Sequence, residues 1–202
     1  GTDLVIAVGN NNQIGDAFIK SNNIGNDSVA INGNNNKIYL GDGDDIALIT
    51  GEKTFVDTGS GNDQVAVSGK NNTINTYTGN DIVSVEGTSH TVNTDRGDDE
   101  VQVKGDSNLI ITGIGDDTVY VNGKKNKIQT GDGNDQVIIE DYIENNITYS
   151  PDGGFADLGK GDDNVTINSI AGNFTIEGGL GANSVKLTNI DLNQYYGTYD
   201  KN

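Results

Sequence analysis

The segment Gly59-Ser-Gly-Asn-Asp63 and the five residues that follow it, Gln64-Val-Ala-Val-Ser68, decide the fold. The first half consists of residues that favour turns, and the second half places valine at every other position. Such a period of two, over five residues and with β-branched side chains, is typical of a half-buried β-strand. The segment therefore predicts a turn followed by a short strand that buries Val65 and Val67.

This pattern returns every 18 residues along most of the chain. A second turn signal, usually an asparagine such as Asn72, comes nine residues after each aspartate, and Ile or Val stands two residues beyond it. Each unit is thus expected to contain two short strands and two turns. The aspartates that repeat in strict register are Asp27, Asp45, Asp63, Asp81, Asp99, Asp117 and Asp135, each with a glycine two residues before it.

A unit of this kind cannot bury its apolar face alone, but stacked units can. We therefore expect an all-β fold, a parallel β-roll or β-solenoid with 18-residue coils about 4.8 Å apart. Its thin interior of Val and Ile ladders is compatible with a hydrophobic content of only 33% and with 29 glycines. No helix of useful length is expected.

The register breaks suggest the organisation of the chain. Residues 1–24 are expected to form a first coil with a six-residue insertion, and residues 25–140 the regular repeats. Residues 141–187 are expected to form irregular coils with a ten-residue loop insertion near 148–157, and residues 188–202 a cap or tail. Because the chain starts at Gly1 without an initiator Met, we expect it to be part of a longer polypeptide.

Composition excludes several function classes. The net charge of −18 disfavours partners rich in phosphate, so neither nucleic acid nor an anionic membrane surface is expected. The absence of cysteine excludes disulfides, thiolate metal sites and cysteine nucleophiles. No apolar run is long enough for a transmembrane segment. His90 is the only histidine and stands at an asparagine position, so it is interpreted as a tolerated turn residue, and no enzyme activity is expected.

Stacking in register brings the repeated aspartates to within about 5 Å of one another. At that distance two unit charges repel by about 1 kcal/mol in water and several-fold more in a protein-like medium. A cation between the coils would remove this repulsion, and Ca²⁺ accepts both carboxylate and carbonyl oxygens. The expected side-chain ligands are the seven aspartates above and Asp163, and the expected carbonyl donors are Gly43, Gly61, Gly79, Gly97, Gly115, Gly133 and Gly161.

Gly59-Ser-Gly-Asn-Asp63-Gln-Val65 and its equivalents resemble the calcium-binding nonapeptide of RTX (repeats-in-toxin) proteins, which Gram-negative bacteria secrete. The resemblance covers about residues 25–140 well and 158–187 loosely. It implies a β-roll that is exported by a type I system, is unfolded at cytosolic calcium and folds around Ca²⁺ outside the cell. The implied function is a non-catalytic module of a secreted or surface protein, a toxin or adhesin. Its partners would be calcium, the rest of the parent polypeptide, and a host-cell surface or glycan receptor.

The sequence departs from the family pattern in two ways. The family motif opens with two glycines. In this chain the first glycine is replaced by threonine, as at Thr58, and in two coils the second is also replaced, by Tyr77 and by Asp95. The second turn of each coil carries Asn instead of Asp, so we expect calcium on one edge and a metal-free Asn ladder on the other. The alternative functions are ice binding, ligand or glycan recognition, or an accessory roll module of a carbohydrate-active enzyme.

Overall fold

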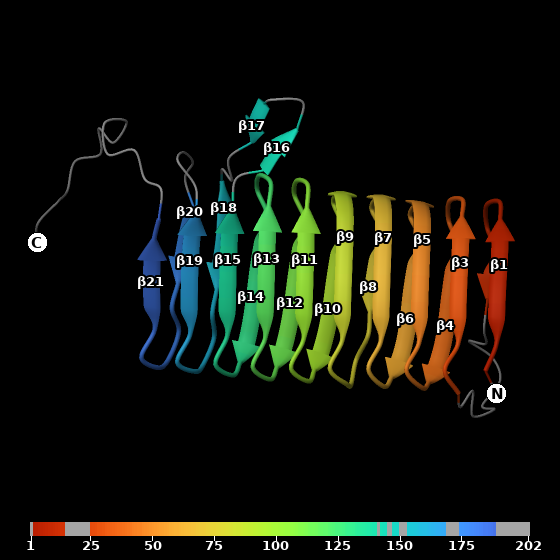
Figure 1. Cartoon of the computed structure of the whole chain (residues 1–202), viewed down its shortest axis with the longest axis horizontal. Coiled ribbons are helices and arrows are strands. Elements are labelled where there is room, and N and C mark those ends of the chain that lie inside the picture. Colours follow the sequence, from red (N-terminus) through yellow and green to blue (C-terminus); the bar gives the residue numbers. More distant parts are fainter. Residues whose placement is uncertain are drawn as a thin grey trace, which may run out of the picture.

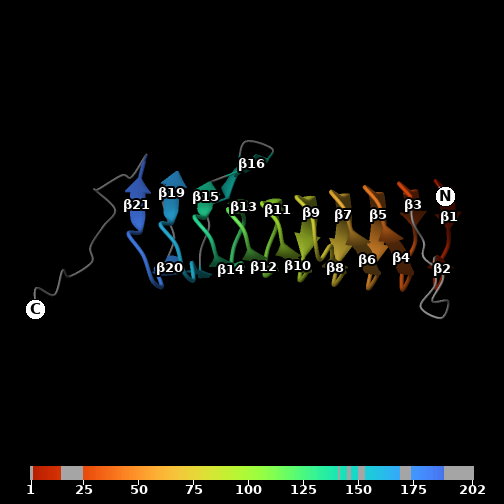
Figure 2. The ribbon, with the colours of Figure 1, turned by 90° about the horizontal axis from the view of Figure 1, so that it is seen from below.

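The computed structural model describes residues 2–14, 25–140, 142–144, 147–149, 153–168 and 174–188. These residues form a parallel β-solenoid of two sheets that face each other, and the described part contains no helix and hence no helical membrane span (Figures 1 and 2). The predicted fold class is confirmed. Along the stack each coil contributes one strand to each sheet, except the last, whose described residues contribute a strand to one sheet only.

The two sheets have ten and nine parallel strands. In spatial order, the ten-stranded sheet contains β1 (Leu4–Val8), β3 (Ser28–Asn32), β5 (Ile46–Glu52), β7 (Gln64–Lys70), β9 (Ile82–Thr88), β11 (Glu100–Lys104), β13 (Thr118–Asn122), β15 (Gln136–Glu140), β19 (Asn164–Asn168) and β21 (Ser184–Leu187). The nine-stranded sheet contains β2 (Gln13–Ile14), β4 (Lys37–Asp42), β6 (Phe55–Ser60), β8 (Thr73–Asn75), β10 (Thr91–Arg96), β12 (Leu109–Ile114), β14 (Lys127–Asp132), β18 (Gly154–Asp157) and β20 (Phe174–Glu177).

The core lies between the sheets and consists of aliphatic ladders. Val65 pairs with Val83 and Val67 with Val85 across β7 and β9, and all four side chains are buried. The nine-stranded sheet contributes Val56, Ile74, Val92, Ile110 and Ile128, each fully buried. The period-two alternation of the sequence therefore corresponds to an inward row and an outward row on every regular strand.

The register breaks are visible in the strand pairing. Leu4 pairs with Ser28, an offset of 24, and the residues numbered 15–24 between them lie outside the described part. Lys127 pairs with Phe155, an offset of 28, so the ten additional residues lie between β15 and β18. They include an antiparallel hairpin of β16 (Tyr142–Glu144) and β17 (Ile147–Tyr149). The suggested cap or tail, from residue 189 on, also lies outside the described residues.

The glycine two residues before each aspartate allows adjacent coils to approach closely. Gly61 has a φ of +133°, and a Cβ placed on it would lie 2.1 Å from the carbonyl oxygen of Gly43 in the preceding coil. No side chain fits at that distance, and a positive φ is costly for other residues. The repeating glycine of the sequence is therefore required by the stack itself.

Candidate functional site

The repeated aspartates form a buried ladder along one edge of the solenoid. Their side chains are between 1% and 3% exposed. The Oδ1 atom of each accepts a hydrogen bond from the backbone N–H of the equivalent aspartate in the preceding coil: the Asp63 N–H donates to Asp81 over 2.8 Å, and the Asp81 N–H to Asp99 over 2.8 Å. This bond repeats without interruption from Asp27 to Asp163, and Asn183 takes the same place in the last coil.

The second carboxylate oxygen in this ladder has no such partner. Oδ2 is buried and without a hydrogen bond in Asp45, Asp63, Asp81, Asp99, Asp117, Asp135 and Asp163. An ionised carboxylate that is buried and half-satisfied is costly unless a charge of opposite sign or a proton compensates it. The ladder therefore offers one unsatisfied, hard oxygen atom per coil to a cation or a proton.

A buried threonine ladder lies beside the aspartates. Thr58, Thr76, Thr94, Thr112 and Thr130 are fully buried, each five residues before an aspartate of its own coil. The hydroxyls of Thr94, Thr112 and Thr130 donate to a backbone carbonyl of the next coil over 3.0–3.2 Å, and each also lies close to the aspartate carboxyl of its own coil. The hydroxyls of Thr58 and Thr76 have no well-formed hydrogen bond, but they lie close enough to Asp63 and Asp81 to favour the ionised form of those carboxyls. Leu40 and Leu158 replace threonine at the two ends of the ladder.

These surroundings favour the protonated form of the buried aspartates. Desolvation is the largest cause and raises the pKa of Asp45 to about 6 and that of Asp81 and of Asp117 to about 7. The pKa values of Asp63, Asp99, Asp135 and Asp163 are raised for the same first reason. The backbone N–H bonds, and in five coils the adjacent Thr hydroxyl, act in the opposite direction but do not cancel the burial.

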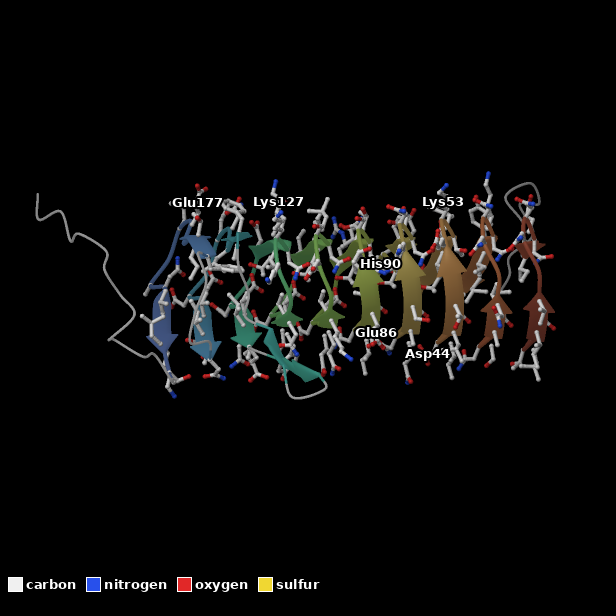
Figure 3. All side chains as sticks on the ribbon, turned by 90° about the horizontal axis from the view of Figure 1, so that it is seen from above. Asp44, Lys53, Glu86, His90, Lys127 and Glu177 are labelled. Carbon is white, nitrogen blue, oxygen red and sulfur yellow. The ribbon has the colours of Figure 1, made fainter. Side chains whose placement is uncertain are left out.

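A second, exposed ladder runs beside the buried one. The residue before each aspartate is Asn or Asp, and its Oδ1 accepts the backbone N–H of the next coil over 2.7–3.0 Å. Figure 3 shows one member, Asp44, which accepts from Asn62. Its direction along the stack is opposite to that of the buried ladder. The adjacent acids that the sequence pairs therefore have different roles, and only the buried member has an orphaned oxygen.

The other edge of the solenoid carries the asparagine ladder. The Thr54 N–H donates to Asn72 Oδ1 over 2.8 Å, and the His90 N–H donates to Asn108 Oδ1 over the same distance. The amide nitrogens of Asn72, Asn108 and Asn126 also donate to glycine carbonyls of neighbouring coils, over 2.9–3.3 Å. These three amides are satisfied by protein atoms on both sides, whereas Nδ2 of Asn36 is buried without a hydrogen-bond partner.

His90 takes the place of an asparagine in this ladder and is 1% exposed. Its Nδ1 accepts the N–H of Asn72 over 3.3 Å, while Nε2 is buried without a well-formed hydrogen bond and the ring lies close to the backbone of Glu86 and Gly69. Figure 3 shows His90 between the two sheets, whereas Glu86 lies on the outer side of β9. Burial lowers the pKa of His90, so the ring is neutral and serves as an acceptor.

We expect His90→Asn to stabilise the solenoid. The amide would keep the acceptor for the Asn72 N–H and replace the poorly aligned contact of the ring with the Gly69 backbone by the amide-to-glycine bond that Asn72, Asn108 and Asn126 form, a gain of about 1 kcal/mol. The difference should grow as the pH falls below the ordinary histidine pKa, because the unfolded chain then binds a proton that the folded chain resists. Thermal unfolding at neutral and at mildly acidic pH measures both effects, and a less stable H90N protein would contradict the assignment.

The structure places the predicted ligand residues as follows. The eight aspartates, from Asp27 to Asp163, lie in one column, and the seven glycines, from Gly43 to Gly161, lie in a second column two residues away. The glycine carbonyls point along the stack toward the next coil, as Gly43 does toward Gly61. Among the described residues no three Asp, Glu or His side chains converge on a point that could hold a metal. The aspartates thus form one column along the stack, and their side chains do not converge in groups of three.

Together these features define the class of the protein: a β-solenoid repeat protein with a stacked ladder of buried aspartates. No protein-family model matches the chain, and the searches of curated proteins and of solved structures found no match either.

Proposed function

We propose that this solenoid is a non-catalytic calcium-binding repeat module, of the RTX type that its motifs resemble, within a larger secreted or surface protein. The observation that carries the proposal is the orphaned Oδ2 atom, which recurs in seven consecutive coils on one edge. The Asn edge offers a comparison within the same molecule, because Asn72, Asn108 and Asn126 use both side-chain polar atoms. The orphaned atoms of the Asn edge are nitrogens, Nδ2 of Asn36 and Nε2 of His90, whereas those of the Asp edge are carboxylate oxygens, which suit a hard cation.

The residues present fit calcium in chemistry, since every donor is oxygen and each coil supplies one buried carboxylate. The Asp ladder from Asp27 to Asp163 would supply the side-chain oxygens, and the glycines from Gly43 to Gly161 would supply carbonyl oxygens. Bound calcium would neutralise the ladder, and its binding free energy would then become folding free energy. The chain's own contribution is a fixed spacing of the carboxylates, set by the N–H bonds from coil to coil.

A calcium-dependent fold suits a protein that is exported in an unfolded state and folds outside the cell. On this proposal the module is extracellular or attached to the bacterial surface, and it acts in a toxin or adhesin. Its partners are calcium ions, the rest of the parent polypeptide and a host-cell surface or glycan receptor. The net charge of −18 supports a calcium-rich setting, because the metal-free chain is strongly self-repelling.

The double variant Asp81→Ala, Asp99→Ala tests the site. It removes two adjacent carboxylates and leaves the N–H groups of Asp63 and Asp81 without their acceptors, at roughly 1–3 kcal/mol each. We expect calcium to raise the melting temperature much less than in the parent protein, and the two flanking parts of the stack to melt separately. The matched control is Glu86→Ala, Glu100→Ala, which removes the same charge from the outer face of the same coils. An unchanged calcium response in the Asp variant would overturn the assignment.

A further inference from the structure

The outer face of the ten-stranded sheet carries a groove that the cation ladder does not use. It crosses the C-terminal halves of β9, β11, β13 and β15, and its volume is about 390 Å³. This volume is within the usual range of small-ligand sites. The groove runs along the solenoid axis, across the strands, so that it meets two rows of outward side chains whose members are about 4.8 Å apart from coil to coil.

One wall of the groove is a row of polar side chains that pair across the sheet. Glu86, Lys104, Asn122 and Glu140 are aligned in register on β9, β11, β13 and β15. Lys104 Nζ is 3.0 Å from Glu86 Oε1, and both side chains are about half-exposed. Glu140 Oε1 accepts the amide of Asn168 over 3.1 Å. The row therefore presents the carboxylates of Glu86 and Glu140, the ammonium of Lys104 and the amide of Asn122 side by side.

The parallel row, two residues earlier on each strand, supplies an aromatic surface. Tyr120 is 37% exposed and lies between Gln102 on β11 and Ile138 on β15. Its ring and Gln102 both line the groove. A planar aromatic face next to amide and carboxylate groups suits a ligand with an apolar ring face and equatorial hydroxyls. By contrast, the outward residues of β5 and β7 in the corresponding rows are Leu48, Thr50, Ala66 and Ser68, which offer neither feature.

The position of the groove also limits its ligand. It lies on the face of the sheet, where the backbone N–H and C=O groups are already bonded to adjacent strands, so a peptide cannot add to it as a strand. The groove contains two carboxylates, Glu86 and Glu140, and one ammonium, Lys104, and this excess of negative charge disfavours phosphate or uronic acid groups. The β16–β17 hairpin projects beyond the outer side of this sheet near the ends of β13 and β15 (Figures 1 and 2).

We propose that this groove is a binding site for a neutral or amino-sugar-containing saccharide, laid along the solenoid axis. Successive sugar units would meet the polar row, and one ring would stack on Tyr120. Within the proposed function, this names the class of surface partner that the module recognises. It does not depend on the Asp ladder, whose carboxylates lie on the edge of the solenoid and inside it.

The test uses four hexasaccharides: β-1,4-glucose, β-1,4-N-acetylglucosamine, β-1,4-glucosamine and α-1,4-galacturonic acid. Each is titrated into the isotopically labelled chain in excess calcium, after circular dichroism has shown that the solenoid is folded. We expect one of the first three to shift the NMR resonances of Gln102 and Tyr120, and Tyr120→Thr to weaken that binding roughly tenfold. Threonine keeps the strand propensity at this outward position.

The matched control is Tyr39→Thr, an outward tyrosine of β4 in the other sheet, which should leave binding unchanged. Three results would overturn the proposal: no shift at Gln102 and Tyr120 with any hexasaccharide, binding of the galacturonic acid chain alone, or equal losses in the Tyr120 and Tyr39 variants. Because folding is verified first, these results are distinct from a failure of the calcium proposal, which would appear as a chain that calcium does not fold or stabilise.

Discussion

In a chelator, the solenoid is expected to be folded at about pH 5 and to lose much of its stability, or its β-structure, by about pH 8. The cause is the buried Asp ladder, in which desolvation raises the pKa to about 6 in Asp45 and to about 7 in Asp81 and Asp117. An unfolded chain has aspartate pKa values near 3.9. Between about pH 4 and pH 7 the folded state thus binds more protons, and stability falls as the pH rises.

The size of this effect follows from the number of groups. The pKa is raised in all seven orphaned carboxyls, so each adds to the loss of stability in the same direction, and we expect the total to be on the order of 10 °C in Tm. His90 acts in the opposite direction, because its pKa is lowered, but it is a single group. Thermal melting followed by circular dichroism at several pH values measures the trend. A metal-free solenoid that is more stable at about pH 8 than at pH 5 would show that the ladder is not the dominant electrostatic feature.

The triple variant Asp81→Asn, Asp99→Asn, Asp117→Asn is expected to stabilise the metal-free solenoid at about pH 8 by 5 °C or more in Tm. Asparagine keeps the Oδ1 acceptor for the N–H of the preceding coil and replaces the orphaned oxygen with a neutral amide. The Asn edge already uses this arrangement, in which Asn72 Nδ2 donates to the Gly51 carbonyl over 2.9 Å. The same variant should lose most of the stabilisation that calcium provides to the middle coils.

Its matched control is Asp44→Asn, Asp98→Asn, Asp116→Asn, which changes the same number of charges in the exposed ladder. Asn62, Asn80 and Asn134 already occupy that ladder, so the substitution is compatible with the stack. We expect the control to retain the calcium response and to change the metal-free Tm by much less. Equal effects of the two triple variants would mean that net charge, and not the buried oxygen, governs stability.

The sequence predicted the fold well because two strong signals agree. The 18-residue period of Asp63 and its equivalents sets the coil length, and the alternation of Val65 and Val67 sets which face is buried. Both are local properties that stacking preserves from coil to coil. The hairpin of Tyr142–Glu144 and Ile147–Tyr149 lies outside the period, and only the 28-residue gap from Asp135 to Asp163 indicated that additional residues were present there.

The roles of the acids were harder to predict. Asp44 and Asp45 are adjacent and chemically identical, yet one accepts from the following coil at the surface and the other from the preceding coil in the interior. The sequence did contain a signal for this difference. The position before each buried aspartate is occupied by either Asn or Asp, as at Asn62 and Asp44, which indicates that it needs a side-chain oxygen and not a charge. The Thr58 column shows the same limit: its fixed spacing of five residues before each aspartate is visible in the sequence, while its effect on the pKa of Asp63 depends on three-dimensional placement.

The groove at Tyr120 could not be predicted from the period, because the residues that line it are those that vary between coils. Lys104, Asn122 and Glu140 occupy one repeat position with three different chemistries. Their common row becomes apparent only when the strand register is known. A repeat protein can acquire a binding site at outward positions whose residues differ from coil to coil, because the backbone that holds them stays the same.

The most direct measurement of the central claim is a calcium titration of the chelator-treated chain at about pH 8, where the raised aspartate pKa values leave the ladder ionised. Circular dichroism should report a gain of β-structure or of thermal stability at sub-millimolar to millimolar calcium, in the range of extracellular calcium modules. Magnesium, which demands a stricter octahedral geometry, should not replace it. A chain that is already fully folded and equally stable at this pH in chelator, and that calcium leaves unchanged, would contradict the account.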